Sequence, residues 1–479
     1  MKMIARAWLV AGALCLTTGC SNPASLEADF LISNVNVVPM ASEVVLADQA
    51  VAVRDGEIVA VVDATEIGAI DAGQVVDGED LYLMPGLSDM HVHLRMDPQA
   101  FLNLHLANGV TTVHNMGNAD GGGALDHVAL RAAVAEGDMA GPRYLISGPQ
   151  LHDTELPDIS AVAAVLEDHA AHGYDTIKVH GDLPDDAFEA LMAGAEASGF
   201  RVTGHFQHMM PLERSLRMDA VEHIEEFLYT DLDGQLAARS GGDDGDLLAA
   251  YYANVKRLHD PAYRRQVVEA VVRSGIFVDA TLIIYATIGD YLDDDRFAAL
   301  PQRPELVYLP ASTRADYLDA EANEYRANLI PLFSGILERE GDPLSPAGHV
   351  DSNVALMSTL MLELHEAGVP LLLGSDVFGA VVPGFATHQE LALMVDAGLT
   401  PYEALRTGTV NPAAYLGESD RAGTLEPGKR ADFILVKGNP LENIGQAAAV
   451  EGVYTGKHWY AKEDLAGMLV EAERLAVAD

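Results

Sequence analysis

Apolar and polar residues alternate in short runs near both ends of the chain. Between Asp29 and Val76, runs such as Ala50–Val53 and Glu57–Val62 are typical of strands, and Asp55-Gly56 between them predicts a hairpin turn. The C-terminal part repeats this pattern, with a strand expected over Ala431–Val436. Because two all-β segments flank the chain, we predict that they pair into one small β-sandwich.

Between these segments, apolar runs of strand length alternate with stretches of helical periodicity. Helical patterns such as Asp185–Ser198 and Asn353–Ala367 follow most of the runs. Eight strands that alternate with helices predict an α/β fold, a (β/α)8 TIM barrel, with reactive side chains at the carboxyl ends of the strands. The expected strands are 84–93, 110–116, 143–148, 176–180, 201–205, 220–224, 276–281 and 370–376.

Two insertions interrupt this alternation, at 230–262 and 283–349. Each connects a strand to its helix, so both should rise from the reactive face and serve as a lid or an oligomer contact. Since the 479 residues exceed the usual size of one domain, we expect a barrel with a smaller companion. The predicted organisation is a signal peptide at 1–20, the first part of the sandwich at 28–83, the barrel at 84–415, and the second part with a tail at 416–479.

The charge is strongly acidic. The formal net charge is −43, with 72 acidic against 29 basic residues spread along the chain, which excludes nucleic acid and anionic lipid as expected partners. The two cysteines, Cys15 and Cys20, both precede the folded body, so no disulfide or thiolate metal site is expected there.

The N-terminus resembles an export signal. Lys2 and Arg6 precede an apolar stretch, Ala7–Leu16, that is too short to span a bilayer. Thr17-Thr18-Gly19-Cys20 resembles a bacterial lipobox, with Cys20 as the lipidated residue, and ordinary cleavage near Ala24 is the alternative. We therefore expect an exported protein, periplasmic or anchored to the outer membrane as a lipoprotein, that meets the membrane only through its lipid.

Polar residues stand at the carboxyl ends of five expected strands. Burying such a group costs several kcal/mol unless it is paired or bound to a metal ion. One buried polar residue could be satisfied locally, but five strands with the same feature indicate a shared ion. The residues are His91 and His93, Lys178, His205, His223 and Asp376.

With these motifs, the chain resembles the amidohydrolase superfamily, closest to its imidazolonepropionase-like branch. The resemblance covers nearly all of the mature chain and rests on Pro85–His93, Asn411–Ala414 and Pro427–Asp432. It implies two divalent ions, zinc by preference. His91, His93 and Asp376 would hold the first ion, and His205 and His223 the second.

By the same resemblance, Lys178 would be carboxylated by CO2 and bridge the two ions. A shared water would lose its proton near neutral pH and attack a carbon–nitrogen bond. Asp376 would accept that proton and deliver it to the leaving nitrogen, as the catalytic residue. If Lys178 instead pairs with a carboxylate, the site would hold one ion.

The substrate is expected to be a small amide with a carboxylate. His91-Val92-His93-Leu94-Arg95 resembles the dihydroorotase motif, in which the arginine binds a carboxylate, and Asn118 stands where that family uses an asparagine. His180 and His388 could also reach the substrate. Dihydroorotase itself is not expected, because Val377 replaces its histidine. A dipeptide or N-acyl amino acid fits better, and a homo-oligomer remains open.

Two other functions remain open. A mononuclear deaminase or cyclic amidohydrolase could use the same fold, although a deaminase tends to carry glutamate where His208 stands, three residues after His205. A lipid-anchored binding protein with an inactive site is the second, although all six ligand positions are filled. Counting metal ions in the purified protein would separate the three.

Overall fold

The computed structural model describes residues 26–117, 126–208, 210–234 and 244–478. The expected export signal with Cys20, and Asn118, lie outside these residues. Among the described helices, none is both long and apolar enough to cross a membrane.

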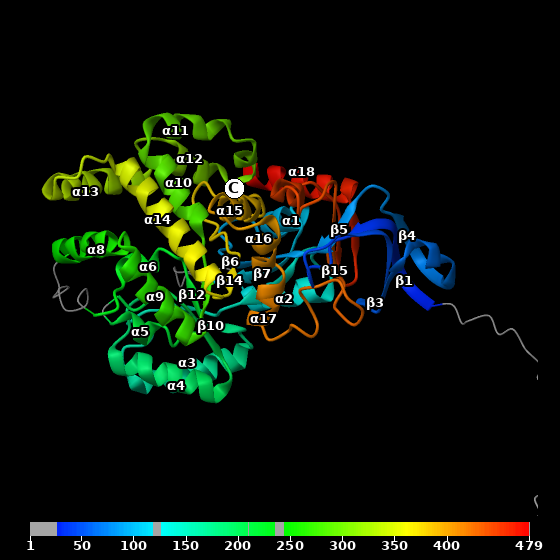
Figure 1. Cartoon of the computed structure of the whole chain (residues 1–479), viewed down its shortest axis with the longest axis horizontal. Coiled ribbons are helices and arrows are strands. Elements are labelled where there is room, and N and C mark those ends of the chain that lie inside the picture. The colour runs from blue at the N-terminus through cyan, green and yellow to red at the C-terminus, as the bar shows by residue number, and fades with distance from the viewer. Residues whose placement is uncertain (1–25, 118–125, 209, 235–243, 479) are drawn as a thin grey trace, which may run out of the picture.

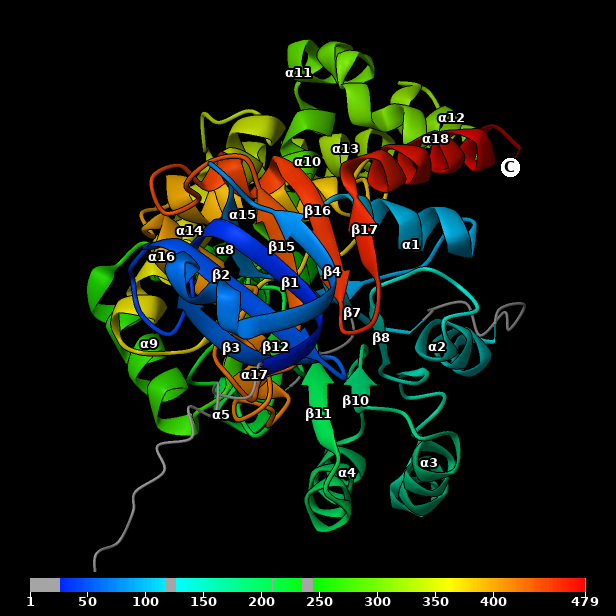
Figure 2. The ribbon, with the colours of Figure 1, turned by 90° about the vertical axis from the view of Figure 1, so that its right-hand side faces the viewer.

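The two ends of the chain pair directly in one sheet, on the right in Figure 1 and facing the viewer in Figure 2. Its strands are β1 (Leu26–Val37), β2 (Leu46–Arg54), β3 (Glu57–Asp63), β4 (Ile70–Asp77), β5 (Tyr82–Pro85), β15 (Asp432–Val436), β16 (Val450–Thr455) and β17 (Trp459–Ala461). The predicted hairpin joins β2 to β3, with φ of 53° at Asp55 and 77° at Gly56. Rings from both ends of the chain pack together, with 4.8 Å between the centroids of Phe30 and Tyr454.

The centre of the chain alternates strands and helices, which confirms the α/β fold. The strands are β6 (Leu87–Val92), β7 (Val110–Asn115), β8 (Arg143–Ile146), β9 (Gln150–Leu151), β10 (Thr176–Val179), β11 (Arg201–Gly204), β12 (Ala220–Glu222), β13 (Phe277–Asp279) and β14 (Leu371–Leu372). They form two parallel sheets, β6-β7-β8 and β9 to β14, rather than one continuous ladder. Met90 N donates to Leu373 O at 2.7 Å, so backbone hydrogen bonds join β6 to the segment after β14.

The helices surround these strands. They are α1 (Pro98–Ala107), α2 (His127–Glu136), α3 (Ile159–His172), α4 (Asp185–Ser198), α5 (Leu212–Ser215), α6 (Glu226–Tyr229), α9 (Pro261–Ser274), α14 (Pro346–Glu366), α15 (Phe385–Asp396), α16 (Pro401–Thr407) and α17 (Val410–Tyr415). Helix α4 has the predicted bounds and is capped at its carboxyl end by Gly199, where φ is 76°. Helix α14 begins at Pro346 rather than at the predicted Asn353, because the Ser345 side chain caps its first turn by accepting a bond from Gly348 N.

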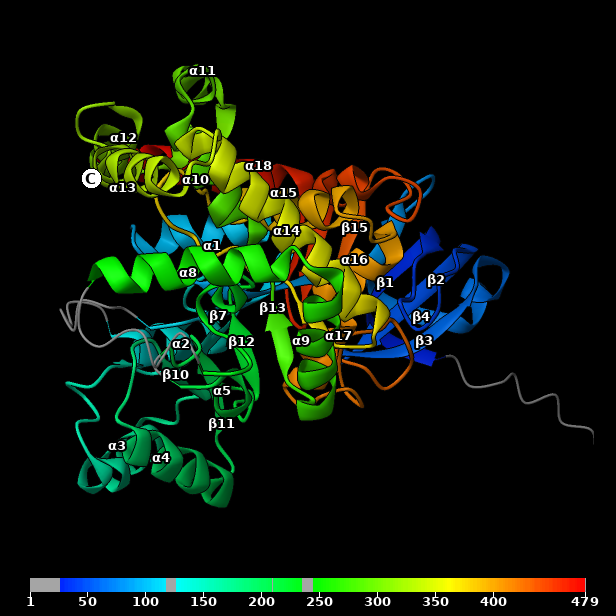
Figure 3. The same cartoon turned by 60° about the vertical axis from the view of Figure 1, so that its left-hand side comes forward.

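The insertions are helical. The first contributes α8 (Asp244–Leu258), and the second contributes α10 (Leu282–Leu292), α11 (Asp294–Ala299), α12 (Ala311–Leu318), α13 (Glu324–Glu340) and the 3-10 helices η2 (Leu300–Gln302) and η3 (Pro304–Tyr308). Figure 3 shows α11, α12 and α13 gathered at one end of the molecule. The remaining 3-10 helices are η1 (Ala64–Ala69) and η4 (Ile444–Ala448).

One expected strand is divided in the structure, and the expected tail contains a helix. The strand expected over 84–93 is divided at Gly86, because Met84 pairs with β15 while β6 pairs with β7. A side chain at Gly86 would place its Cβ 2.2 Å from Thr111 Oγ1, so the crossing point has no room for one. The expected C-terminal tail is helix α18 (Lys462–Ala478), which packs against α1.

Candidate metal centre

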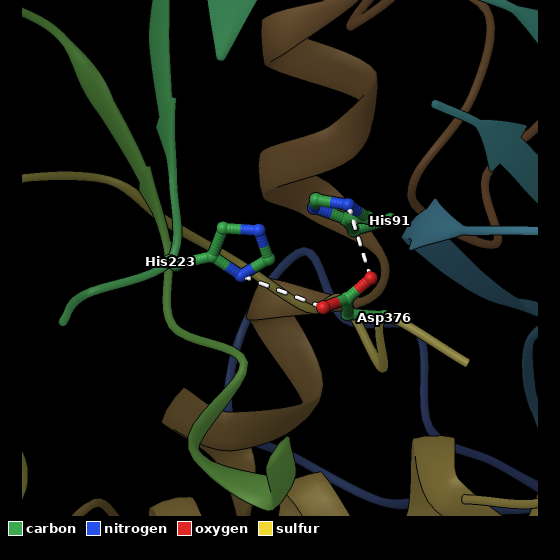
Figure 4. Close-up of side chains that lie close together, drawn as sticks. All are labelled: His91, His223 and Asp376. Carbon is green, nitrogen blue, oxygen red and sulfur yellow. Dashed lines mark ion pairs between the residues drawn. The ribbon is translucent and has the colours of Figure 1, made fainter. Parts of the chain in front are cut away.

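Four of the six predicted ligands meet directly at the ends of β6, β12 and β14. Asp376 Oδ1 lies 3.4 Å from His91 Nε2 and 3.2 Å from His93 Nε2, and Asp376 Oδ2 lies 3.9 Å from His223 Nδ1. Figure 4 shows the Asp376 carboxylate between the rings of His91 and His223. These three residues hold ligand atoms within 4.8 Å of one another, so they could hold one metal ion.

His205 and Lys178 complete the group from β11 and β10. The ring of His205 lies 4.8 Å from that of His223, centroid to centroid. Lys178 is fully buried, and its Nζ has no hydrogen-bond partner in the described part of the chain. Burial lowers the pKa of Lys178, against the opposing effect of nearby carboxylates, of which Glu222 is the strongest.

Most of the ring nitrogens turned away from the centre are held by other groups. His93 Nδ1 lies 2.8 Å from Gly117 O, His91 Nδ1 2.8 Å from Glu222 Oε2, and His205 Nδ1 3.2 Å from Glu226 Oε1. Such contacts fix the ring and direct the other nitrogen toward a metal ion. Burial also holds the pKa of His91 well below its usual value, so the neutral imidazole keeps a free lone pair.

The two glutamates were not predicted as site residues. Glu222 precedes His223, and strand alternation would place them on opposite faces. The φ of 74° at His223 ends that alternation, and both side chains contact His91. Glu226 also lies 2.7 Å from His208 Nε2, and this carboxylate raises the pKa of His208 to about 9 although burial lowers it.

Asp279 on β13 is a further buried acid that sequence reasoning missed. Neither of its carboxylate oxygens has a hydrogen-bond partner among the described residues, and burial raises its pKa well above the usual value. It forms a second set of possible ligands with His91 and Glu222. The other residues of its strand, Phe277 and Val278, are apolar, so an acid at this position was a signal that the sequence carried.

Of the residues expected to bind substrate, some lie near the centre and one does not. Arg95 is exposed beside a cavity of about 200 Å³, with its guanidinium 5.2 Å from the centroid of Phe378. His180 lies 4.4 Å from the ring of His205. His388 is not part of this group, because it lies on α15 with its Nε2 2.7 Å from Asn108 O. That contact removes the basis for expecting it at the substrate.

The cavity beside Arg95 joins the centre to the second insertion. Its walls include His93, Phe378, Leu309, Thr313 and Tyr317. Residues from the insertion therefore face a predicted metal ligand across the cavity. Two larger grooves, of about 620 and 790 Å³, contain none of the predicted metal ligands.

Comparison with known proteins identifies the family. The model of the amidohydrolase family matches residues 82–468. The chain belongs to the amidohydrolase family. As an amidohydrolase, it is a hydrolase that acts on carbon–nitrogen bonds.

Curated relatives of this amidohydrolase include an imidazolonepropionase of Ralstonia nicotianae, 25% identical over 86% of this chain and 93% of the relative. An imidazolonepropionase of Symbiobacterium thermophilum is 25% identical over 83% and 85%. Adenine deaminase 2 of Shouchella clausii is 24% identical over 46% of this chain, and the match spans only 37% of the deaminase.

Solved structures share the fold of this amidohydrolase. A bottromycin amidohydrolase has a TM-score of 0.69 at 22% identity, covering 93% of this chain and 90% of that one. A Xaa-Pro dipeptidase with bound methionine has a TM-score of 0.60 at 20% identity, covering 90% and 99%. At these identities the similarity establishes the fold alone.

Proposed function

We propose that this amidohydrolase is a metal-dependent hydrolase of small amides that carry a carboxylate. Its two parallel sheets would together form the (β/α)8 barrel, with the centre at the carboxyl ends of the strands. Two divalent ions, zinc by preference, would lie among His91, His93, Lys178, His205, His223 and Asp376.

Lys178 is the observation that carries this proposal. A buried ammonium without a partner is costly, and the lowered pKa of Lys178 favours the neutral amine. The neutral amine is the form that adds to CO2, and it releases a proton to the solvent as the carbamate forms. The two oxygens of such a carbamate could serve as ligands for two cations. The set of imidazole and carboxylate donors around it fits zinc.

The metal ions and Asp376 would then have separate roles in the reaction. When bound, the ions would polarise the substrate carbonyl and activate a water molecule. Asp376 reaches both sides of the centre, so its carboxylate would accept a proton from that water and return it to the leaving nitrogen. Burial raises the pKa of Asp376, but the neighbouring histidines outweigh that effect and lower it, so the carboxylate is ionised.

Arg95 would bind the carboxylate of the substrate. The structure shows no ion pair for Arg95 among the described residues, although acidic residues outnumber basic ones 72 to 29 in this chain. An unpaired arginine beside a cavity suits an anionic ligand. A dipeptide or an N-acyl amino acid meets this requirement, and the cavity accommodates one end of such a molecule.

A substrate panel tests this function. Metal-loaded protein should hydrolyse some dipeptides or N-acyl amino acids, and Arg95→Gln should raise KM for them about tenfold or more. The same variant should leave KM unchanged for the matching C-terminal amides. Arg314→Gln is the control, because Arg314 follows the cavity residue Thr313 in sequence but donates to Val307 O. Release of ammonia from cyclic amidines instead would support the deaminase.

We also propose export with a lipid anchor on Cys20, from the lipobox-like Thr17–Cys20 alone. Mass spectrometry of the mature N-terminus should show a diacylglyceryl cysteine. A free N-terminus near Ala24 would contradict the anchor and leave secretion.

A further inference from the structure

A pair of histidines lies at the rim of the proposed centre. His152 follows β9 and His180 follows β10, and His152 Nε2 lies 3.1 Å from His180 Nδ1. The backbone N–H groups of His180 and Gly181 both donate to Leu151 O, at 3.0 and 3.2 Å, which fixes the two segments side by side. A Cβ at Gly181 would lie 2.9 Å from His152 Cδ2, so the ring packs closely on this glycine.

The spacing of this pair matches that of the deeper pair of predicted ligands. His91 Nε2 and His93 Nε2 are 3.3 Å apart, compared with 3.1 Å at the rim. Two nitrogens that bind one tetrahedral zinc ion at about 2.0–2.1 Å are separated by roughly 3.3 Å. The two rim nitrogens share a hydrogen bond and lie about 0.2 Å closer than a shared zinc ion would hold them, so a small movement of one ring would admit an ion.

Glu155 holds His152 as other glutamates hold the predicted ligands. Its Oε2 lies 3.3 Å from His152 Nδ1 and is itself fixed by bonds from His152 N at 3.0 Å and Thr154 Oγ1 at 2.7 Å. Glu222 and Glu226 hold the Nδ1 atoms of His91 and His205 in the same way. The carboxylate leaves His152 Nε2 directed at His180.

The rim pair begins a continuous row of rings that ends in the centre. Ring centroids are 4.9 Å apart from His152 to His180, 4.4 Å from His180 to His205, 4.8 Å from His205 to His223 and 4.6 Å from His223 to His91. The exposed fraction of the side chain falls from 33% at His152 to 19% at His205, 6% at His223 and zero at His91.

We propose that His152 and His180 form an entry site that captures a divalent metal ion and passes it to His205. The proposal rests on the metal centre of the proposed function. With two imidazoles and water as ligands, such a site binds weakly, which suits transfer rather than storage. The net charge of −43 concentrates cations at the protein surface, and the row offers them a path inward.

The rate of metal loading tests this proposal. Metal-free full-length protein is mixed with Zn²⁺ or Co²⁺, and uptake is followed by metal analysis and the visible spectrum of Co²⁺. His152→Ala should load at least tenfold more slowly than wild type, yet reach the same final metal content and activity. Glu155→Gln should slow loading less. His172→Ala is the matched control, because His172 also pairs with a carboxylate, Asp168 at 3.1 Å, away from the row.

Gly181→Ala is the second variant, because it keeps both histidines but displaces the His152 ring. It should slow loading as His152→Ala does, and crystals of wild-type protein in excess Zn²⁺ should show an anomalous peak between His152 and His180. Equal loading rates in wild type and both variants, with metal at His91 and His93, would overturn the entry site alone. Protein that binds no divalent ion at His91 and His93 would overturn the proposed function and the entry site together.

Discussion

Three residues at consecutive strand ends adopt left-handed backbone angles. The φ values are 74° at His223, 44° at Thr281 and 43° at Asp376. For residues other than glycine, each such conformation costs about 1–3 kcal/mol and is retained where the surroundings impose it. Thr281 Oγ1 lies 2.8 Å from His223 Nδ1, and Glu390 accepts bonds from the next two backbone N–H groups, at 3.0 and 2.7 Å. The strain is thus concentrated where the side chains must converge.

The pair of His208 and Glu226 predicts a pH dependence of stability. The pKa of His208 is about 9 in the folded protein, compared with about 6.5 in an unfolded chain. Since the folded pKa is raised, the stabilisation is complete below about pH 6.5 and is lost as the pH rises through 9. We expect the free energy of unfolding of wild type to fall relative to His208→Asn over this window, by denaturant titration. An unchanged difference from pH 6 to 10 would contradict the pairing.

The sequence placed the ligand candidates because each stands in an otherwise apolar strand. It could not place Glu222 and Glu226, whose contacts depend on how β12 ends and how the chain turns into α6. It also could not exclude His388, because a helical residue near a strand end can face the site or a neighbouring helix. His388 instead contacts the backbone oxygen of Asn108. The packing of α15 determines this contact, and the sequence does not show that packing.

At the scale of elements, the alternation of strands and helices could be predicted because apolar residues recur with different periods in strands and in helices. The division at Gly86 was not predictable, because no polar residue separates Met84–Pro85 from the start of β6 and the two parts differ in their partners. Helix α18 was missed because its helical pattern follows a turn-rich region that reads as a tail. Its partner α1 ends at Ala107, far earlier in the chain, so local sequence could not reveal the contact.

Two glycines should respond in opposite ways to alanine. At Gly204 in β11, φ is 149° and a Cβ would lie 1.8 Å from Val179 O, so Gly204→Ala should cost more than about 4 kcal/mol or prevent folding. Gly335 lies within α13 with open space around it, so Gly335→Ala should stabilise by about 0.5–1 kcal/mol. Thermal unfolding measures both, and a tolerated Gly204→Ala would refute the packing of β10 on β11.

The second insertion should influence substrate binding rather than metal binding. Tyr317 lines the cavity and packs edge-on to Phe378, with 5.6 Å between ring centroids. We expect Tyr317→Ala to raise KM several-fold while the metal content stays at the wild-type value. Leu332→Ala, at a 43% exposed position of α13, is the control. Unchanged kinetics on every active substrate would assign the insertion to assembly.

At the scale of the whole molecule, the acidic charge opposes folding. A net charge of −43 repels itself in the compact state, and salt screens this repulsion over a Debye length of about 10 Å at 0.1 M. We expect the free energy of unfolding to rise by about 2 kcal/mol or more between 0.05 and 1 M KCl. The test is denaturant unfolding at several salt concentrations, and a flat dependence would show that the acidic groups are compensated locally.

The most direct test of the account is the number of metal ions bound per chain in wild type and in Lys178→Ala. Inductively coupled plasma mass spectrometry on both purified proteins, with turnover measured in parallel, supplies this number. We predict two ions in wild type, at most one in Lys178→Ala, and loss of most activity in the variant. A Lys178→Ala protein that keeps two ions and the turnover of wild type would contradict the bridging role of Lys178, and with it the two-metal centre.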